Sequence, residues 1–292
     1  MGLRTSITER QRRLGAELRK LRERSGMVTK EAGEVIGMGS AHLSHIEAGR
    51  TSILTARLRA LCEAYGCTDE PYVEALVRMA EDSGKGWWTE HRKSVSPIAL
   101  DLAELEAGAT RACSYETLFI PGLLQTESYM RAIFGSAQDP DPETAVRFRL
   151  TRQKVLGGEP ALPLHAVIHE AALRITVGGP EVMREQLMHL IEAARLPNMT
   201  IQVLPFEAGA LKNISASFLL LSGQAGGLET VVADDPAQWT VFLGDEGAVE
   251  GYSKAFQRLA GSALPQVDPE AVPERHLMRD SLGLIQHIAY AL

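Results

Sequence analysis

The sequence has few cysteines, few aromatic residues and no long apolar run, and each shortage excludes a class of protein. Its 292 residues include three cysteines, and none of them forms a Cys-x-x-Cys pair. This argues against a disulfide framework or a zinc ribbon and favours buried free thiols. No apolar run approaches the roughly 18 residues of a membrane helix, and residues 1–13 carry charges where a signal peptide is apolar. We therefore expect a cytoplasmic protein without a membrane segment.

The length and the overall composition are those of a folded protein with more than one domain. A chain of 292 residues exceeds what one compact helical core supports. Hydrophobic residues make up 45% and charged residues 23%, which excludes wholesale disorder and a fibrous repeat. We expect at least two domains.

Positive charge is scarce overall but is concentrated at the start of the chain. The formal net charge is −7, whereas residues 1–70 hold 12 Lys and Arg against 9 Asp and Glu, a net charge of +3. The remaining residues, 71–292, therefore carry −10. A phosphate backbone attracts the first charge and repels the second, so the asymmetry fits a basic binding head on an acidic body. A difference of +3 is also small enough to arise by chance.

Helical spacing dominates the first seventy residues. Leu14, Leu18 and Leu21 fall at i, i+4 and i+7 of an amphipathic helix with a basic exterior, which ends at Ser25-Gly26. A second short helix is predicted over 29–36. Its Gly33 costs up to about 1 kcal/mol of helix propensity, which predicts that another helix approaches closely there.

A third short helix is predicted within GMGSAHLSHIEAGR, residues 37–50. Gly37 supplies a left-handed residue, Gly39-Ser40 can begin the helix, and Leu43 and Ile46 face the core. Small residues at the start of a helix allow its backbone to approach phosphate, while larger polar side chains reach base edges. The pattern thus favours insertion into DNA, although both histidines also fit a solvated surface. The residues left outside are Ser40, Ala41, His42, Ser44 and His45.

A fourth helix with Leu58, Leu61, Cys62 and Tyr65 closes the bundle before Gly66. We therefore predict an all-α domain over 1–70. Residues 71–96 are predicted to form a helix and a linker, whose Trp87 and Trp88 fit an anchor between domains and core packing equally well.

These residues resemble the lambda-repressor-like, or XRE-type, helix-turn-helix family. The resemblance covers about residues 13–67 and rests on LGAELRKLRERSG, on the step from Gly26 to Gly37, and on HLSHIEAGR and LRALCEAYG. It implies that the third helix lies in the major groove of double-stranded DNA. Departures are Val28-Thr29, where the family commonly has Thr-Gln, and the absence of the usual Pro after Gly49-Arg50.

The resemblance implies a set of DNA-binding residues. Ser40, Ala41, His42 and His45 fall on positions that face bases, and Arg50 falls on one near phosphate. Thr29 and Lys30, at the start of the second helix, and Ser44 complete the predicted set.

The rest of the chain is similar to the domain that follows this module in streptomycete regulators of the WhiJ type. The similarity spans nearly all of 87–265 and includes SYETLFIPGLLQTESYMRAI at 114–133. It implies an antitoxin-like actinobacterial regulator of development or antibiotic production, often associated with a small partner protein.

The pattern of elements over 97–292 predicts an α+β domain. LHAVIHEAAL at 164–173 and MTIQVLPF at 199–206 are predicted strands, and the helix 180–196 between them predicts a right-handed crossover that places them parallel. FLLLSG, ETVVAD and WTVFLG predict three more strands joined by short connections. Residues 98–112 fit a helix or an extended edge, and Cys113–Phe119 fits a strand. Further helices are predicted over 121–133, over 142–156 with its Arg147, Arg149, Arg152 and Lys154 mostly solvated, and over 252–264.

No residue pattern indicates a metal, a cofactor or catalysis. His165 and His169, with Glu170, share a strand but lack helical His-Glu-x-x-His spacing and a third ligand nearby. No serine or cysteine has an evident base partner. We expect the chain to have no enzymatic activity, cofactor or metal.

Two interpretations remain open. The first is a homodimeric DNA-binding transcriptional regulator whose C-terminal domain receives a small molecule or a small partner protein, and which is nucleoid-associated when bound. The second is an antitoxin-like module that mainly holds a partner protein and uses DNA binding for autoregulation. Tyr115–Tyr129 is interpreted as core, or alternatively as the effector or partner surface.

Overall fold

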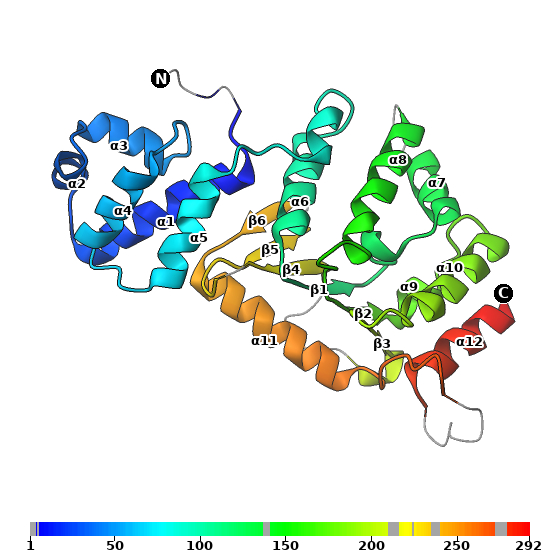
Figure 1. Cartoon of the computed structure of the whole chain (residues 1–292). Helices are drawn as coiled ribbons and strands as arrows, with labels where there is room; N and C mark the ends of the chain where they lie inside the picture. Colours follow the sequence, from blue (N-terminus) through cyan, green and yellow to red (C-terminus); the bar gives the residue numbers. More distant parts are fainter. Residues whose placement is uncertain are drawn as a thin grey trace. The chain divides into compact units, whose positions relative to one another are not determined.

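The computed structural model describes residues 4, 6–136, 141–209, 216–223, 225–234, 240–271 and 279–292 (Figure 1). Backbone contacts divide the chain into two compact units. The first contains residues 1–92, 96–105 and 224–228, and the second contains 93–95, 106–223 and 229–292. Both units thus combine segments that are distant in the sequence. The borders predicted at residues 70 and 96 stay predictions.

The first unit is helical. α1 begins at a capping box, in which Thr8 and Gln11 exchange hydrogen bonds, and ends at Gly26, whose φ is 76°. Gly37 also has a left-handed φ of 65°, as predicted from the sequence. The elements are α1 (Glu9–Ser25), α2 (Thr29–Val35), α3 (Ser40–Glu47), α4 (Thr55–Ala64), α5 (Glu70–Glu81), the 3-10 helix η1 (Trp87–His91) and the first part of α6 (Pro97–Gly108).

One apolar core lies inside this unit. Leu18, Leu43, Leu58 and Leu61 are fully buried, each on a face that the helical spacing predicts. Gly33 has no room for a side chain, because a Cβ atom there would lie 2.6 Å from the carbonyl oxygen of Met38. The sequence prediction of a close approach is therefore confirmed, but the partner is the turn before α3 and not another helix.

The second unit is built on a six-stranded sheet with the order β3-β2-β1-β4-β5-β6. β1, β2 and β3 pair in parallel, whereas β4, β5 and β6 continue from β1 in antiparallel pairs. The parallel pairing of β2 with β3 was predicted and is confirmed. The strands are β1 (Arg111–Glu116), β2 (Leu164–His169), β3 (Met199–Leu204), β4 (Phe218–Ser222), β5 (Thr230–Ala233) and β6 (Val241–Leu243).

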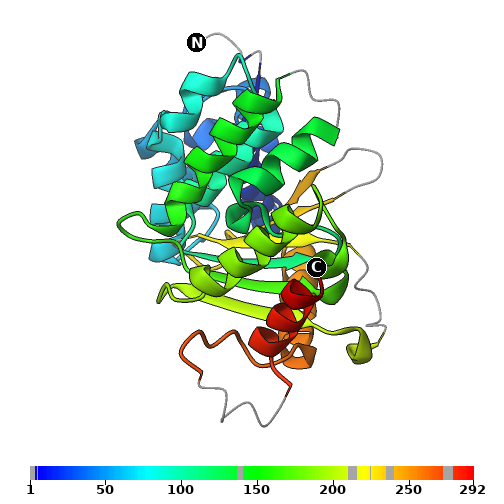
Figure 2. The same ribbon diagram turned by 90° about the vertical axis from the view of Figure 1, so that its right-hand side faces the viewer.

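Helices lie on both sides of the sheet in the second unit. Figures 1 and 2 show α7, α8 and α10 on one side and α11 on the other. Phe256 and Leu259 of α11 pack against the strand residues Cys113, Val167 and Phe218. The helices are α7 (Glu127–Ser136), α8 (Pro142–Gln153), α9 (Glu170–Arg174), α10 (Pro180–Ala193), α11 (Glu246–Ser262) and α12 (Ser281–Ala291), with short 3-10 helices η2 (Gly122–Leu124), η3 (Lys154–Leu156) and η4 (Phe206–Ala208).

The predicted class, an all-α N-terminal helix-turn-helix bundle followed by an α+β C-terminal domain, is confirmed. Among the described residues, none of the helices combines the length and the apolar composition that crossing a bilayer requires.

The prediction of a single helix over 121–133 was wrong. Gln125 is extended and separates η2 from α7. Its amide Nε2 donates to the carbonyl of Ile120 at 2.7 Å, and the backbone N–H of Thr126 donates to Oε1 of Gln186 at 2.7 Å. These side-chain bonds replace the intrahelical ones that a continuous helix would make.

The strand predicted over 164–173 ends early, at His169. The backbone of His169 is extended, and its ring Nδ1 accepts a hydrogen bond from the N–H of Ala171 at 3.1 Å. An N-cap of this kind starts a helix, so residues 170–174 form α9 and not strand.

Arg152 was predicted to be mostly solvated, and this prediction was wrong. Its guanidinium donates to both carboxylate oxygens of Glu106 at 2.7 and 3.1 Å, and the two side chains are 9% and 1% exposed. The spacing of α8 alone does not reveal a partner 46 residues away.

Candidate nucleic-acid interface

α3 presents a polar face that no other described element of its unit buries. Leu43 and Ile46 are 0% and 2% exposed and hold the helix on the core. The opposite face carries side chains that are exposed or half-buried, namely Ser40, Ala41, His42, Ser44 and His45. All five positions predicted on this helix are thus accessible.

The start of α3 offers backbone donors. Its N-cap is Gly39, and no side chain caps it. N–H groups in the first turn of a helix have no intrahelical partner and attract anions. Ser40 and Ala41 are small and exposed, so a phosphate or a groove wall can approach this end closely.

α1 supports α3 through direct backbone packing. Gly15 of α1 is buried, and a Cβ atom there would lie 2.4 Å from the carbonyl oxygen of Glu47 and 2.8 Å from that of Ile46. No larger residue fits without moving one helix. The position of α3 in the unit therefore depends on this glycine.

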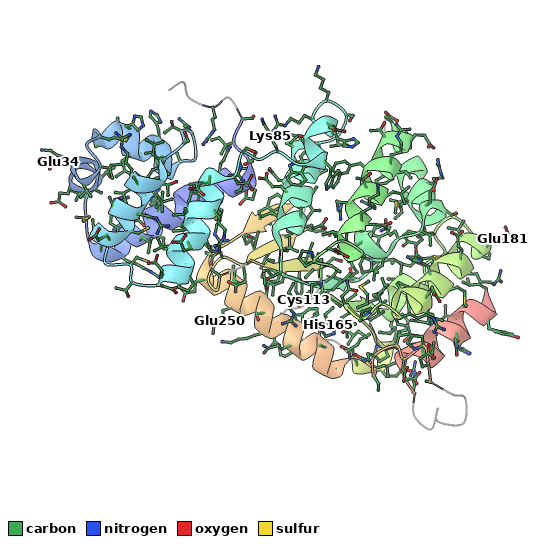
Figure 3. All side chains as sticks on the ribbon, viewed as in Figure 1. Glu34, Lys85, Cys113, His165, Glu181 and Glu250 are labelled. Atoms are coloured by element: carbon green, nitrogen blue, oxygen red, sulfur yellow. The ribbon has the colours of Figure 1, made fainter. Side chains whose placement is uncertain are left out.

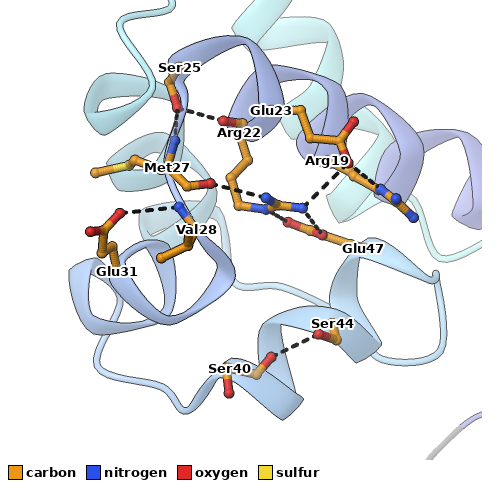
Figure 4. Close-up of polar contacts among 10 residues, drawn as sticks. All are labelled: Arg19, Arg22, Glu23, Ser25, Met27, Val28, Glu31, Ser40, Ser44 and Glu47. Carbon is orange, nitrogen blue, oxygen red and sulfur yellow. Dashed lines mark hydrogen bonds and ion pairs between the residues drawn. The ribbon is translucent and has the colours of Figure 1, made fainter.

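A buried ion pair fixes the end of α3 (Figure 4). Arg22 of α1 donates to both carboxylate oxygens of Glu47, at 2.6 and 3.0 Å, and also to the carbonyl of Met27 at 3.1 Å. The two charged side chains are 11% and 7% exposed. The bond to Glu47 raises the pKa of Arg22. Two parallel hydrogen bonds define an orientation as well as a distance.

Ser44 differs from its neighbours on the polar face. Its hydroxyl donates to the carbonyl of Ser40 at 3.0 Å, one turn earlier in α3 (Figure 4). The donor is thus occupied inside the helix, and the oxygen remains free to accept. Ser44 can therefore accept a hydrogen bond from an external donor while its own proton stays within the helix.

Two further predicted DNA-binding residues lie at the start of α2, the helix that precedes α3. Thr29 is half-buried and Lys30 is exposed. The carboxylate of Glu31 accepts from the backbone N–H of Val28 at 3.1 Å, which fixes the first turn of α2. Glu34 points outward from the same helix (Figure 3), so α2 exposes charges of both signs.

Arg50 follows α3 on the surface of the unit. Arg4 lies against this turn, because its backbone N–H donates to the carbonyl of Arg50 at 2.9 Å and its guanidinium donates to that of Gly49 at 2.8 Å. Among the described residues, no carboxylate lies within ion-pair distance of Arg50. Its exposed guanidinium is therefore available to an external anion.

Comparison with protein families agrees with this geometry. Residues 13–76 match a helix-turn-helix domain, and these residues include α2, α3 and the turn between them. Residues 99–271 match a domain described as a domain of unknown function, DUF5753, which covers more than half of the chain. The chain belongs to the DUF5753 family. No curated protein and no solved structure matches it.

In this DUF5753 chain, the histidines considered as metal ligands make structural contacts. His165 lies beside Cys113 on the side of the sheet that faces α11 (Figure 3), and its Nε2 bonds Oε1 of Gln202 at 2.7 Å. His169 caps α9, and Glu170 pairs with Arg174 at 2.8 Å. Among the described residues, no group of three or more His, Cys, Asp or Glu is placed to hold a metal ion.

The segment Tyr115–Tyr129 is mostly core. Tyr115, Leu124 and Tyr129 are 3%, 1% and 0% exposed, whereas Leu118 and Phe119 are 52% and 48% exposed. The surface alternative is thus restricted to the loop after β1.

Sequence reasoning missed the residues that hold α3, namely Arg4, Arg22 and Glu47. A signal was present, because Glu47 follows Leu43 and Ile46 at core spacing in α3, and a carboxylate in that position needs a cation. Arg22 lies four residues after Leu18 on the inner face of α1 and fits that need.

Proposed function

We propose that this DUF5753 protein is a sequence-specific DNA-binding transcriptional regulator that acts as a homodimer. The third helix of each copy enters the major groove, with His42 and His45 at base edges and Arg50 at phosphate. The C-terminal domain receives the signal, from a ligand or from a small partner protein.

One observation carries this proposal. α3 buries two apolar side chains, leaves a face of small and polar ones accessible, and begins without a side-chain cap. An ion pair and a buried glycine fix this helix from behind. Insertion into a groove needs such fixing, because base readout depends on a defined helix position.

The finer parts of the proposal rest on the resemblance to WhiJ-type regulators. On that basis the protein is an antitoxin-like actinobacterial regulator that controls development or antibiotic production and is associated with the nucleoid when bound to DNA. That the protein is a regulator without enzymatic activity also belongs to the proposal.

The test is a titration of the full chain against a duplex from the control region of its own gene, over a range of salt concentrations. Wild type should bind with a salt dependence that reflects several phosphate contacts. Arg50→Ala should weaken binding to all sequences alike and lower the slope of log K against log salt by about one unit.

His45→Ala should instead relax base preference and leave the salt slope unchanged, and it serves as the matched variant. If Arg50→Ala changed base preference with an unaltered slope, the two roles would be wrong. If the folded chain retained no duplex at modest ionic strength, alone or with a partner, the proposed function itself would fall.

A further inference from the structure

A cluster of charged side chains lies at one edge of the sheet in the second unit. β1 ends at Glu116, and the antiparallel register places Thr117, Ser217 and Asp234 beside each other at the same edge. The Thr117 backbone N–H donates to the Ser217 hydroxyl at 3.1 Å. β1 is the strand at which parallel pairing changes to antiparallel pairing. The strand order also reverses at β1, because β2 and β3 follow on one side of it and β4 on the other. In open α/β sheets, ligands bind outside the carboxyl ends of the parallel strands at such a point.

Arg149 of α8 contributes a cation to this cluster. Its Nη1 donates to Oε1 of Gln125 at 2.5 Å, and its guanidinium lies 4.6 Å from the ring centre of Phe134. Among the described residues, no carboxylate forms an ion pair with Arg149, although Glu106 and Glu116 lie close enough to act on its charge. Burial lowers the pKa of Arg149 to about 10. A half-buried guanidinium without a carboxylate is costly unless an anion compensates it.

Glu116 contributes a carboxyl group that is not paired with a cation. Burial raises its pKa to about 7, and its hydrogen-bond partner is the hydroxyl of Ser217. Glu170, at the same edge, differs, because it bonds Arg174 and the backbone N–H of Phe206. Arg149 and Glu116 act on each other's pKa without forming an ion pair, so the hydrogen-bonding atoms of both can contact a third group.

The loop between these groups adds apolar surface. It runs from Glu116 to Gly122, where a Cβ atom would lie 3.3 Å from Nη2 of Arg152 and 3.8 Å from Nε of Arg149. The loop therefore borders the cluster, and its Leu118 and Phe119 are about half exposed. Single exposed apolar residues are ordinary, but two adjacent ones on a loop whose end, Gly122, borders Arg149 fit a ligand with two kinds of surface.

We propose that the second unit binds a small organic acid, whose carboxylate contacts Arg149 and whose apolar part covers Leu118 and Phe119. Protonated Glu116 donates a hydrogen bond to the same ligand. That this ligand is the signal received by the regulator rests on the proposed function. Binding of the ligand itself is measured without DNA.

Binding should depend on pH in a defined direction. Deprotonated Glu116 repels a carboxylate, so affinity should fall as pH rises from about 6 to about 8. The other titratable or charged groups around Glu116 are Arg149 and Arg152 of α8, Glu106 of α6, Tyr129 of α7 and Asp234 after β5. Of these, only Asp234 and Glu106 also carry carboxyl groups, and Glu106 is paired with Arg152.

The experiment titrates the full chain with acetate, benzoate, phenylacetate and octanoate, each up to about 10 mM, by calorimetry and ligand-observed NMR. At least one apolar acid should bind more tightly than acetate, and phenylacetamide, which lacks the charge, should bind at least tenfold more weakly than phenylacetate, as expected for about 1.4 kcal/mol of charge-assisted bonding. Arg149→Lys should weaken binding about tenfold, because an ammonium cannot form the paired hydrogen bonds of a guanidinium. Arg147→Gln, on the exposed side of the same helix, should leave it unchanged.

Glu116→Gln should retain binding but lose the pH dependence, which also shows that the cluster still folds. The inference is overturned if none of the four acids binds the folded wild-type chain. It is equally overturned if phenylacetamide matches phenylacetate, or if folded Arg149→Lys binds as wild type does. Failure of DNA binding would leave each of these outcomes unaffected.

Discussion

Glu47 is the residue on which the position of α3 depends most directly. Its carboxylate is 7% exposed and receives two hydrogen bonds from Arg22. Removing one partner of a buried pair leaves the other charge uncompensated. We expect Glu47→Leu to lower the free energy of unfolding by about 3 kcal/mol and to abolish any DNA retention. Urea denaturation followed by circular dichroism measures the first effect.

Arg19→Met is the matched control, since it removes an exposed ion pair within α1, the helix that carries Arg22. Arg19 and Glu23 are 63% and 53% exposed, so their pair adds little to stability. Equal losses of stability in Glu47→Leu and Arg19→Met would show that burial does not distinguish the two pairs.

Glu116 should make stability fall as pH rises. Its folded pKa of about 7 lies above its ordinary value of 4.5, so the native state binds the proton more tightly than the unfolded state. The contribution is complete below about pH 4.5 and is lost as pH passes 7. We expect the free energy of unfolding of Glu116→Gln, relative to that of wild type, to be about 2 kcal/mol higher at pH 8 than at pH 5. Urea denaturation at both pH values measures this difference.

Three histidines act in the opposite direction and serve as the internal reference. Burial lowers the pKa of His165, His169 and His189, so their contribution is lost as pH falls below about 6.5. Wild type and Glu116→Gln share these histidines, and the difference between the two curves isolates Glu116. Parallel curves would refute the assignment.

At the scale of elements, the contact between α1 and α3 is set by Gly15. Alanine favours helix over glycine by up to about 1 kcal/mol, yet a Cβ atom at Gly15 would lie 2.4 Å from a backbone oxygen. We expect Gly15→Ala to destabilise the first unit despite its helix propensity, because two backbones would have to separate. Thermal unfolding by calorimetry measures this.

Gly251 in α11 provides the control, because it is exposed and a Cβ atom there would meet nothing within 4 Å. Gly251→Ala should raise stability by about 0.5 to 1 kcal/mol. If both substitutions were stabilising, the close approach of α1 to α3 would be incorrect.

Elements with local signals were predictable from the sequence, and elements defined by distant partners were not. The spacing of Leu14, Leu18 and Leu21 and the glycine at 37 locate α1 and the end of α2 without any tertiary information. The break at Gln125 depends on the bond of its side chain to the carbonyl of Ile120 and on Gln186, which lies 60 residues after its partner Thr126. α12 was not predicted at all, although Asp280 caps it and Ser281 bonds the edge strand β3.

In the candidate interface, too, some residues could be predicted from local spacing and others could not. Every predicted α3 residue lies on the accessible face, because the 3.6-residue period fixes faces once the core positions are known. The residues that hold the helix were missed, although Arg22 and Glu47 each lie at core spacing in their own helix, because periodicity does not show that two residues 25 positions apart pair with each other. Periodicity thus predicts which residues are accessible, and only the fold shows how the helix is held.

At the scale of the whole molecule, the proposal concerns a basic head on an acidic chain. Residues 1–70 carry +3 and the remainder −10, so one copy has little electrostatic attraction for DNA beyond residues 1–70. Two copies on one duplex double the favourable contacts, and a homodimer would place its two α3 helices in successive major grooves about 34 Å apart.

The spacing of the two half-sites tests this arrangement. Once the bound sequence is mapped, inserting five base pairs between its halves turns the second half-site to the opposite side of the duplex. We expect affinity to fall to that of a single half-site, a loss of at least about a hundredfold, because only one α3 can then reach a groove. Inserting ten base pairs returns the second half-site to the same face of the duplex but moves it farther from the first. Affinity should then recover little if the dimer is rigid, and much if its two DNA-binding domains move independently. Electrophoretic retardation with the two inserted duplexes and an uninserted control measures all three affinities, and equal affinity for all of them would mean that a single copy recognises the site.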